Sequence, residues 1–481
     1  MNKTPESSAS LESTEFSSSG FGIAHGATWL LIGTGFNPWL LGALLKPVET
    51  SWKVALLLAV QICLSAVGLL LIAKKRHKIL HFGMLAVAIS SGFALLLAEV
   101  AVRLLVPDGA VRVLRENPHS ETSFRLQPNL KLTVPFQGHK IEIATNEHGM
   151  RWGKVSIEKP QDTKRIAFVG DSFTFGDWAT SVQKTYVGQV QENLNKHSSR
   201  EGGAKLEVLN FGVGGYGFED MALIIEEEIL RFSPDYIVVG MFTGNDFRDT
   251  WLGPKRGVVS NGILIANTAW INERIPTAQN SRYGRAAKDK SRLKILVENV
   301  ALLKLLRRVT ASRRAKKPKK STIRNYEINT TDFTAYTFWN QIPYPEVANK
   351  AVDASKKVLQ TLHAKLKKSE VKLIVVSLPT QQQIYNTTEK GDGFDMKRPQ
   401  VLLEETLQES GVPYFDLLPS FRNAAKASPT PEFFAVPDIH YNDKGHAFAG
   451  KLIADFLLDE ISASSALTAT TSVTSGPNEL K

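Results

Sequence analysis

The stretch RIAFVGDSFTFG, residues 165–176, decides how the chain folds around it. Its apolar run 166–169 predicts a buried strand, which stops at Gly-Asp-Ser before a helix-compatible stretch begins near Ala179. The serine of this turn, Ser172, would lie at the carboxyl edge of a sheet, where open α/β folds bind their ligands, and near the free amides of a helix N-terminus. Ser172 is therefore a candidate nucleophile. From the turn alone, the alternative is that it caps the following helix.

Strands and helices alternate after this turn. Apolar runs predict four further strands, with helix-compatible stretches between them. The strands are expected at 206–210, 236–241, 371–378 and 412–417, and the helices at 219–231, 346–368 and 397–408. Strands that are apolar on both faces and separated by helices predict a mostly parallel sheet covered on both sides. We therefore expect a three-layer α/β/α domain over residues 165–460.

A histidine motif lies near the carboxyl end of this domain. The segment VPDIHYN, residues 436–442, precedes a predicted helix that begins near Asp443. Acyl transfer by a serine needs a base beside the hydroxyl and an acid that orients the base. Asp438 lies two residues before His440 on this loop, so we interpret His440 as the base and Asp438 as its orienting acid. His446 falls inside the predicted helix and is interpreted as a structural histidine.

Two loops that follow strand ends add hydrogen-bond donors at the same edge of the sheet. NFGVGGYG, residues 210–217, follows the second strand, and FTGND, residues 242–246, follows the third. Glycines let a backbone amide approach a substrate closely, and the asparagine side chain is a second kind of donor. Gly and Asn are also ordinary turn residues, so neither loop alone indicates a function.

Taken in order, GDSFTFG, NFGVGGYG, GND and DIH resemble the SGNH, or GDSL, hydrolase family. The resemblance covers the predicted α/β/α domain and implies a flavodoxin-like fold and ester chemistry. It implies that Ser172 is the nucleophile, His440 the general base and Asp438 the acid that orients it. It also implies an oxyanion hole formed by the amides of Ser172 and Gly215 and by the side chain of Asn245.

Two features depart from the family's usual pattern. Its third block is commonly Gly-x-Asn-Asp, whereas Gly244 here stands directly before Asn245. Its last block is commonly Asp-x-x-His, and the shorter spacing here predicts a weaker hold of the Asp438 carboxylate on the imidazole. Asp246 is expected to support its loop rather than react.

The first 106 residues hold most of the strongly apolar runs. Residues 1–20 are expected to form a disordered tail, and residues 21–106 a membrane region. Its spans are predicted at about 27–45, 54–73 and 82–105, each with a buried core helix as the alternative. The basic loop KKRHK, residues 74–78, is placed in the cytoplasm by the positive-inside bias. We therefore expect a multi-pass protein of the bacterial cytoplasmic membrane whose catalytic domain is extracytoplasmic.

Three other segments have distinct compositions. Short alternating patterns predict a β-rich neck over residues 107–164, and residues 461–481 are expected to be a disordered tail. A long insertion, residues 248–342, contains most of the excess positive charge: residues 282–320 carry 15 Lys and Arg against 2 Asp and Glu, in a chain of net charge +11. The insertion predicts an amphipathic basic helix and a flexible basic loop. These either cover the domain or contact anionic lipid or an acidic polymer; no nucleic-acid motif accompanies them.

The sequence predicts neither a metal nor an organic cofactor. The ten histidines have no paired ligand spacing, and the single cysteine, Cys63, supplies neither a disulfide framework nor a cysteine zinc site. The glycines of 212–217 lack the third-glycine spacing of a dinucleotide-binding turn.

The leading prediction is a membrane-anchored serine esterase that removes O-acetyl or other small acyl groups from an envelope or secreted polysaccharide. One alternative is an O-acyltransferase in which a sugar hydroxyl replaces water and a membrane partner delivers the acyl group. The other is a catalytically silent protein that binds polysaccharide. The sequence assigns no oligomeric state.

Overall fold

The computed structural model describes part of the chain. The described residues are 18–35, 37, 51–105, 113–116, 124–136, 139–201, 205–260, 263–274, 300, 303, 333, 335–386, 388–427, 431–436 and 438–474. Contacts divide the chain into two compact units. One unit comprises Met1–Pro107 and Lys288–Lys317, and the other comprises Asp108–Ala287 and Pro318–Lys481.

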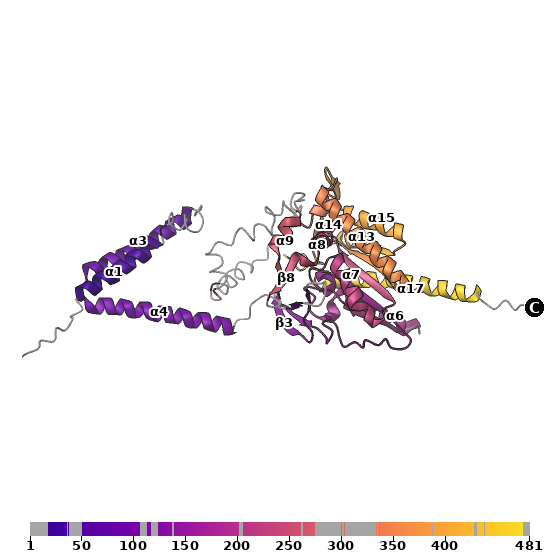
Figure 1. The fold of residues 1–481 in the computed structure, drawn as a ribbon, viewed down its shortest axis with the longest axis horizontal. Helices are drawn as coiled ribbons and strands as arrows, with labels where there is room; N and C mark the ends of the chain where they lie inside the picture. Colours follow the sequence, from indigo (N-terminus) through magenta and orange to yellow (C-terminus); the bar gives the residue numbers. More distant parts are fainter. Residues whose placement is uncertain are drawn as a thin grey trace, which may run out of the picture. The chain divides into compact units, whose positions relative to one another are not determined.

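In the larger unit, several of whose helices Figure 1 labels, five parallel strands form the central sheet. They are β5 (Thr163–Gly170), β6 (Lys205–Asn210), β7 (Tyr236–Phe242), β10 (Lys372–Leu378) and β13 (Tyr414–Asp416). Their order is β13-β10-β7-β5-β6, which is the flavodoxin-like order with β5 between β6 and β7. The predicted parallel sheet is confirmed, with small shifts at the strand ends.

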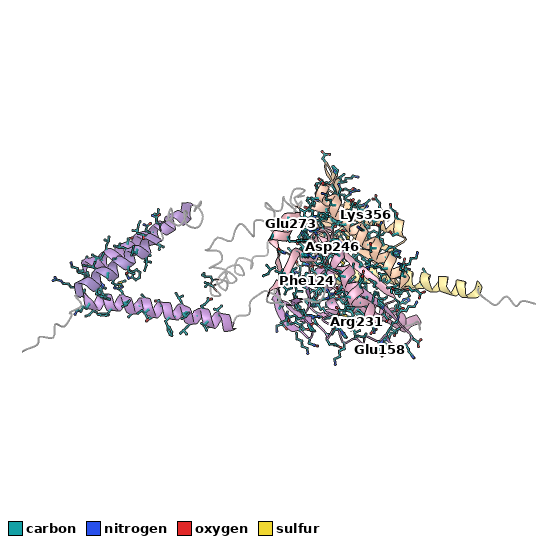
Figure 2. The ribbon with its side chains drawn as sticks, viewed as in Figure 1. Phe124, Glu158, Arg231, Asp246, Glu273 and Lys356 are labelled. Carbon is teal, nitrogen blue, oxygen red and sulfur yellow. The ribbon has the colours of Figure 1, made fainter. Side chains whose placement is uncertain are left out.

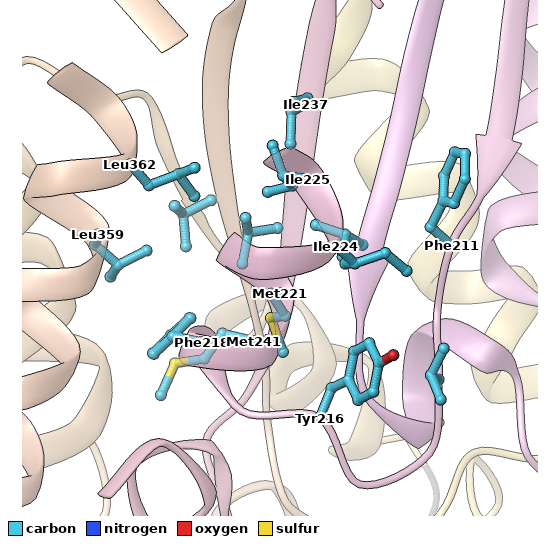
Figure 3. Packing of buried hydrophobic residues seen from close by; sticks show 14 of the residues in the cluster. Phe211, Tyr216, Phe218, Met221, Ile224, Ile225, Ile237, Met241, Leu359 and Leu362 are labelled. Carbon is cyan, nitrogen blue, oxygen red and sulfur yellow. The ribbon is translucent and has the colours of Figure 1, made fainter. Parts of the chain in front are cut away.

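The strands bury side chains in two apolar cores, one on each face of the sheet. Along β5, Ile166 and Phe168 contribute to one core, whereas Ala167 and Val169 contribute to the other. Helices cover both faces. The first core includes residues of α6 (Tyr186–Glu201), α16 (Leu418–Ala425) and α17 (Asp443–Thr474), and the second includes residues of α7 (Phe218–Glu227), α13 (Glu346–Lys368) and α15 (Arg398–Ser410). Figure 3 shows part of the second core, with Leu359 and Leu362 of α13 beside the apolar side chains of α7.

The helix after β5 begins earlier than the sequence predicted. Helix α5 (Ser172–Phe175) starts at the serine rather than near Ala179. Its N-cap is Asp171, whose carboxylate accepts a hydrogen bond from the Phe173 amide at 2.9 Å. The alternative that Ser172 caps this helix is therefore wrong.

Helix α17 continues to Thr474, into the segment where we expected a disordered tail. Its apolar residues Ile453 and Leu457 are fully buried in the core. Beyond them the sequence runs through Ala, Ser and Thr without a helix-breaking residue until Gly476 and Pro477, so nothing local ends the helix earlier.

The neck, residues 107–164, packs onto the α/β domain. Its strands pair antiparallel, β1 (Leu114–Glu116) with β2 (Phe124–Leu126) and β3 (Lys131–Phe136) with β4 (His139–Ala144). Phe124, labelled in Figure 2, is fully buried and packs edge-on against Tyr216 from the loop after β6, with ring centroids 5.2 Å apart. The neck and the α/β domain thus share one apolar core.

The insertion is described mainly in its first and last parts, residues 248–260, 263–274 and 335–342. It begins within α8 (Asp246–Leu252), and a hairpin of β8 (Gly257–Ser260) and β9 (Ile263–Ala266) leads to α9 (Thr268–Arg274). The predicted basic helix lies almost wholly outside the described residues, and the basic loop lies outside them entirely.

The described residues of the smaller unit form the helices α1 (Ser18–Gly35), α3 (Ser51–Ala73) and α4 (Lys78–Leu105). Glycines let α1 and α3 approach closely: a Cβ on Gly26 would lie 2.7 Å from the Gly68 carbonyl oxygen, and one on Gly68 would lie 2.8 Å from the Gly26 carbonyl oxygen. Small residues at such contacts are typical of helices packed in membranes.

The expectation of three membrane spans needs correction. Among the described residues, one helical segment is long and apolar enough to cross a membrane, Lys78–Val102, and a shorter apolar segment covers Leu58–Ala73. Helix α1 begins at Ser18, inside the predicted tail, and ends before Asn37-Pro38 instead of spanning 27–45. The proline explains this end, because it disfavours helical geometry in the preceding residue. Residues 38–50 lie outside the described part of the chain.

A fully buried arginine ties three segments together at the start of β5. Arg165 donates from Nε to Glu207 of β6 at 2.7 Å and from its terminal nitrogens to four main-chain carbonyl groups. The accepting carbonyls belong to Ser156, Ile157, Glu158 and Phe232.

We expect Arg165→Ala to lower the free energy of unfolding by about 3–5 kcal/mol, because it leaves the Glu207 carboxylate and several carbonyls without their donor. Urea denaturation of the full-length protein in detergent measures this change. Lys196→Ala removes an exposed pair with Glu192 and serves as the control, with an expected loss below about 1 kcal/mol. Equal losses for both variants would contradict the structural role of Arg165.

Candidate active site

The strand order brings three loops to one edge of the sheet. β5 lies between β6 and β7, so the strand order reverses at β5. The loops after these three strands converge at this point, where open α/β sheets bind their ligands. Gly170 permits the close approach, because a Cβ there would lie 2.6 Å from the Gly240 carbonyl oxygen of β7. Ser172 follows directly, at the first residue of α5, so its amide is one of the free amides of the first helical turn.

The hydroxyl of Ser172 lies at the start of a hydrogen-bonded chain. His440 Nε2 lies 2.7 Å from Ser172 Oγ, and His440 Nδ1 lies 2.5 Å from Asp438 Oδ1. The His440 ring also packs against the Phe173 ring, with centroids 4.9 Å apart. The three residues expected to act together are thus within hydrogen-bonding distance, although the sequence separates Ser172 from His440 by 268 positions.

The short Asp-x-His spacing does not keep the carboxylate away from the imidazole. Asp438 Oδ1 accepts hydrogen bonds from both the ring Nδ1 and the main-chain amide of His440, the latter at 3.1 Å. The two bonds form a tight local turn that fixes the ring. The predicted weakening is therefore absent from the geometry.

Several carboxylates surround the imidazole. Burial lowers the pKa of His440, but Asp438, Asp177 and Asp171 together raise it above its ordinary value. Burial also acts to raise the pKa of Asp438, and the hydrogen bonds and charge of His440 outweigh it, so this carboxyl is held below its usual range. Asp438 is therefore ionised at neutral pH and stabilises the imidazolium.

The sequence reasoning missed Asp177. Its Oδ2 lies 3.7 Å from His440 Nε2, on the side of the ring that faces Ser172. Gly176 ends α5 in the left-handed region at φ +88°, which turns the chain so that Asp177 follows close to the site. The signal was its position directly after GDSFTFG, but only the fold brings it to His440.

His446 has the structural role that we expected. Its Nδ1 accepts a hydrogen bond from the Tyr186 amide at 3.2 Å, and its Nε2 lies 3.3 Å from the Asp177 carbonyl oxygen. Burial lowers the pKa of His446 to about 3, so the ring stays neutral. This contact supports the backbone of Asp177, whose side chain lies beside His440.

Asn245 is held by a carboxylate and an arginine on the next turn of its helix. Asn245 Nδ2 donates to Asp249 Oδ2 at 2.6 Å, and Arg248 pairs with both oxygens of the same carboxylate. The i, i+4 spacing of Asn245 and Asp249 is a sequence signal that could have revealed this pair. Asp246 accepts from the Phe242 amide at 2.9 Å, so it supports the loop as expected.

The glycine loop after β6 is fixed by a second buried arginine. Gly215 has a φ of +87°, and its carbonyl oxygen accepts a hydrogen bond from Arg256. Arg256 also pairs with Asp220 at 2.6 Å. Neighbouring Gly214 lies against the nucleophile, since a Cβ there would be 3.7 Å from the Ser172 Cβ.

The model of the GDSL-like Lipase/Acylhydrolase family matches residues 168–448, more than half of the chain. The chain belongs to this family. The match begins within β5 and ends within α17, so it includes every residue of the candidate site of this acylhydrolase. It leaves out the neck and the first part of the smaller unit, Met1–Pro107.

Solved structures show a distant likeness to this GDSL-like acylhydrolase. A two-domain esterase active on acetylated mannans is 13% identical with a TM-score of 0.33, and the match covers 63% of this chain and 50% of that one. An acetyl xylan esterase is 15% identical with a TM-score of 0.32, covering 62% and 99%. An acetylxylan esterase from Geobacillus stearothermophilus is 14% identical with a TM-score of 0.32, covering 60% and 91%. Comparison with curated proteins gives no match.

Metal binding was also considered. Within the described ranges, no group of three or more His, Cys, Asp and Glu side chains could hold a metal ion.

We expect Asp177→Asn to lower the pKa of His440, because it removes a negative charge that favours the imidazolium. The base must be neutral to accept a proton, so activity is lost as the pH falls through the His440 pKa. The variant should therefore keep its activity to lower pH than the parent chain does. The acid limb of the kcat/KM profile measures this shift.

Asp353→Asn, on the exposed face of α13, is the matched control and should leave the acid limb in place. An acid limb that stays put or moves to higher pH in Asp177→Asn would contradict the electrostatic role of Asp177.

Proposed function

We propose that this protein is a serine ester hydrolase anchored at the bacterial cytoplasmic membrane, which removes acyl groups from a carbohydrate outside the cytoplasm. The observation that carries the proposal is the hydrogen-bonded chain from Ser172 Oγ through His440 to Asp438. A hydroxyl becomes nucleophilic when such a base takes its proton. Membership of an acylhydrolase family agrees with this chemistry.

The reaction proceeds in two steps. Ser172 Oγ bonds to the acyl carbonyl carbon while His440 Nε2 takes the hydroxyl proton. The tetrahedral intermediate collapses as His440 gives this proton to the leaving alcohol oxygen, and the acyl group stays on Ser172. Water then attacks the acyl-serine with His440 again as the base. The carboxylic acid leaves and Ser172 regains its proton.

An oxyanion hole would be formed by the amides of Ser172 and Gly215 and by Asn245 Nδ2. Three observations support these assignments. The Ser172 amide belongs to the first turn of α5. Gly215 has its backbone held by Arg256 at the same edge of the sheet. Asn245 has one side of its amide occupied by Asp249, which fixes the direction of the remaining N–H. Donors fixed in advance stabilise the oxyanion without reorganisation.

The membrane attachment rests on the smaller unit. Helix α4 exposes large apolar side chains along its length, among them Phe82, Phe93 and Leu95, with exposed fractions of 59, 61 and 61%. A buried core helix would not do so, whereas a helix facing lipid does. The basic loop 74–78 precedes α4 and would stay in the cytoplasm, so the chain after α4 would emerge on the other side. Acylated polysaccharides of the envelope or of secreted material are the ester substrates that this location favours.

We expect Ser172→Ala to abolish labelling by a fluorophosphonate probe and to reduce hydrolysis of p-nitrophenyl acetate by at least ~10³-fold, because the nucleophile is removed. Ser369→Ala, at the exposed end of α13, is the matched control and should retain both. Failure of the parent chain to label or to hydrolyse any aryl ester would refute the proposal.

We expect alkaline phosphatase fused after Glu158 to be active in a bacterial host, because this enzyme folds only after export from the cytoplasm. A fusion within residues 74–78 should be inactive, since this loop is predicted to remain inside. An inactive fusion at Glu158 together with an active fusion in the loop would contradict the proposed topology.

A further inference from the structure

The neck, the segment around the end of α5 and the loop after β6 line an apolar cavity of about 230 Å³. Most of its wall comes from the neck, chiefly from strands β1 to β4, and the rest comes from the end of α5, the segment after it and the loop after β6. The apolar side chains of the neck in this wall are Val113, Leu114, Leu126, Val134, Ile141 and Ile143.

The cavity borders the nucleophile. Gly214 is part of its wall, and a Cβ placed on this glycine would lie 3.7 Å from the Ser172 Cβ. Asp177 is also part of the wall, and its carboxylate lies 3.7 Å from His440 Nε2. Two independent wall residues thus lie next to the two residues that handle the ester.

The chemistry of the wall selects the acyl side of an ester over its sugar side. A sugar ring needs hydrogen-bond partners for its hydroxyls, and burying it without them is costly. Arg151 is a polar residue of the wall and is fully buried. Its terminal nitrogens already donate to main-chain carbonyls, namely those of Glu142, Phe175, Gly176 and Ala179. An alkyl chain needs no hydrogen-bond partners, and its burial in an apolar pocket is favourable because its surface is removed from water.

We propose that the neck strands form an acyl pocket, and that the preferred ester carries an alkyl chain of medium length rather than an acetyl group. This inference rests on the proposed function, and it names the acyl group that the same site accepts. The apolar side chains that the neck contributes to the pocket precede residue 168, where the family match begins, so they lie outside the part of the chain that the family model matches. A cavity of roughly 150 Å³ holds a benzene ring, so the pocket has room for about six to eight carbons.

The geometry also fixes how the chain sits during the reaction. When Ser172 Oγ bonds to the carbonyl carbon, the alkyl chain passes Gly214 into the pocket, and the alcohol leaves on the open side with the proton from His440. Each methylene that enters the pocket should raise kcat/KM about three- to fourfold, until the pocket is full.

The test is a series of p-nitrophenyl esters from acetate to dodecanoate, hydrolysed by the full-length protein in non-ionic detergent. We expect kcat/KM to rise from acetate to a maximum between hexanoate and octanoate and to fall at dodecanoate. Val134→Phe fills the pocket and should lower the octanoate-to-acetate ratio of kcat/KM at least tenfold. Val401→Phe makes the same change on the exposed face of α15 and should leave this ratio unaltered.

A parent chain that prefers acetate to octanoate overturns the acyl pocket while leaving the serine hydrolase proposal intact. No hydrolysis at any chain length instead refutes the proposed function. If Val134→Phe loses its thermal unfolding transition, Ile141→Ala enlarges the same pocket and should move the optimum to longer chains. An unchanged optimum in this variant counts against the pocket.

Discussion

The pairing of β5 with both β6 and β7 is the constraint on which the rest of the catalytic unit depends. Parallel strands end at the same edge, and a strand in this position has neighbours whose loops run to opposite sides of the sheet. The three separate loops that carry Ser172, Gly215 and Asn245 therefore begin at the same edge of the sheet. The fourth contribution comes from the loop before α17, which is fixed because α17 packs against the face of the sheet covered by α6.

Buried arginines hold the loops that this pairing brings together. Arg151 connects the carbonyl of Glu142 in the neck to those of Phe175, Gly176 and Ala179 in the segment after α5. Arg256 holds Gly215, and Arg248 holds the carboxylate that orients Asn245. A planar guanidinium has five donors in a fixed arrangement, so one side chain can satisfy several backbone carbonyls at once. These hydrogen bonds hold the loops in place before a substrate arrives, which the proposed oxyanion hole would require.

The neck is part of the folded unit that holds the candidate site. Its apolar side chains share a core with the α/β domain, and they surround the cavity beside Ser172. The segment that the family model matches begins at residue 168 and contains all residues of the candidate site. The segment before it shapes the space that the acyl group would enter. The proposed ester chemistry and the proposed acyl specificity thus depend on adjoining parts of one chain.

The sequence by itself determined the parallel sheet, the serine at the end of its first strand and the aspartate-histidine pair near the last helix. These follow from local patterns: short apolar runs, a Gly-Asp-Ser turn and two side chains two residues apart. It did not reveal that Asp171 caps α5, that Asp177 lies beside His440, or that the neck encloses a cavity, because these contacts join segments whose positions depend on packing. It also suggested three membrane spans where the described helices support one, since apolar composition alone does not fix where a helix begins and ends. Tertiary structure decided these features because burial and hydrogen bonding across the sheet, rather than local propensity, set their geometry.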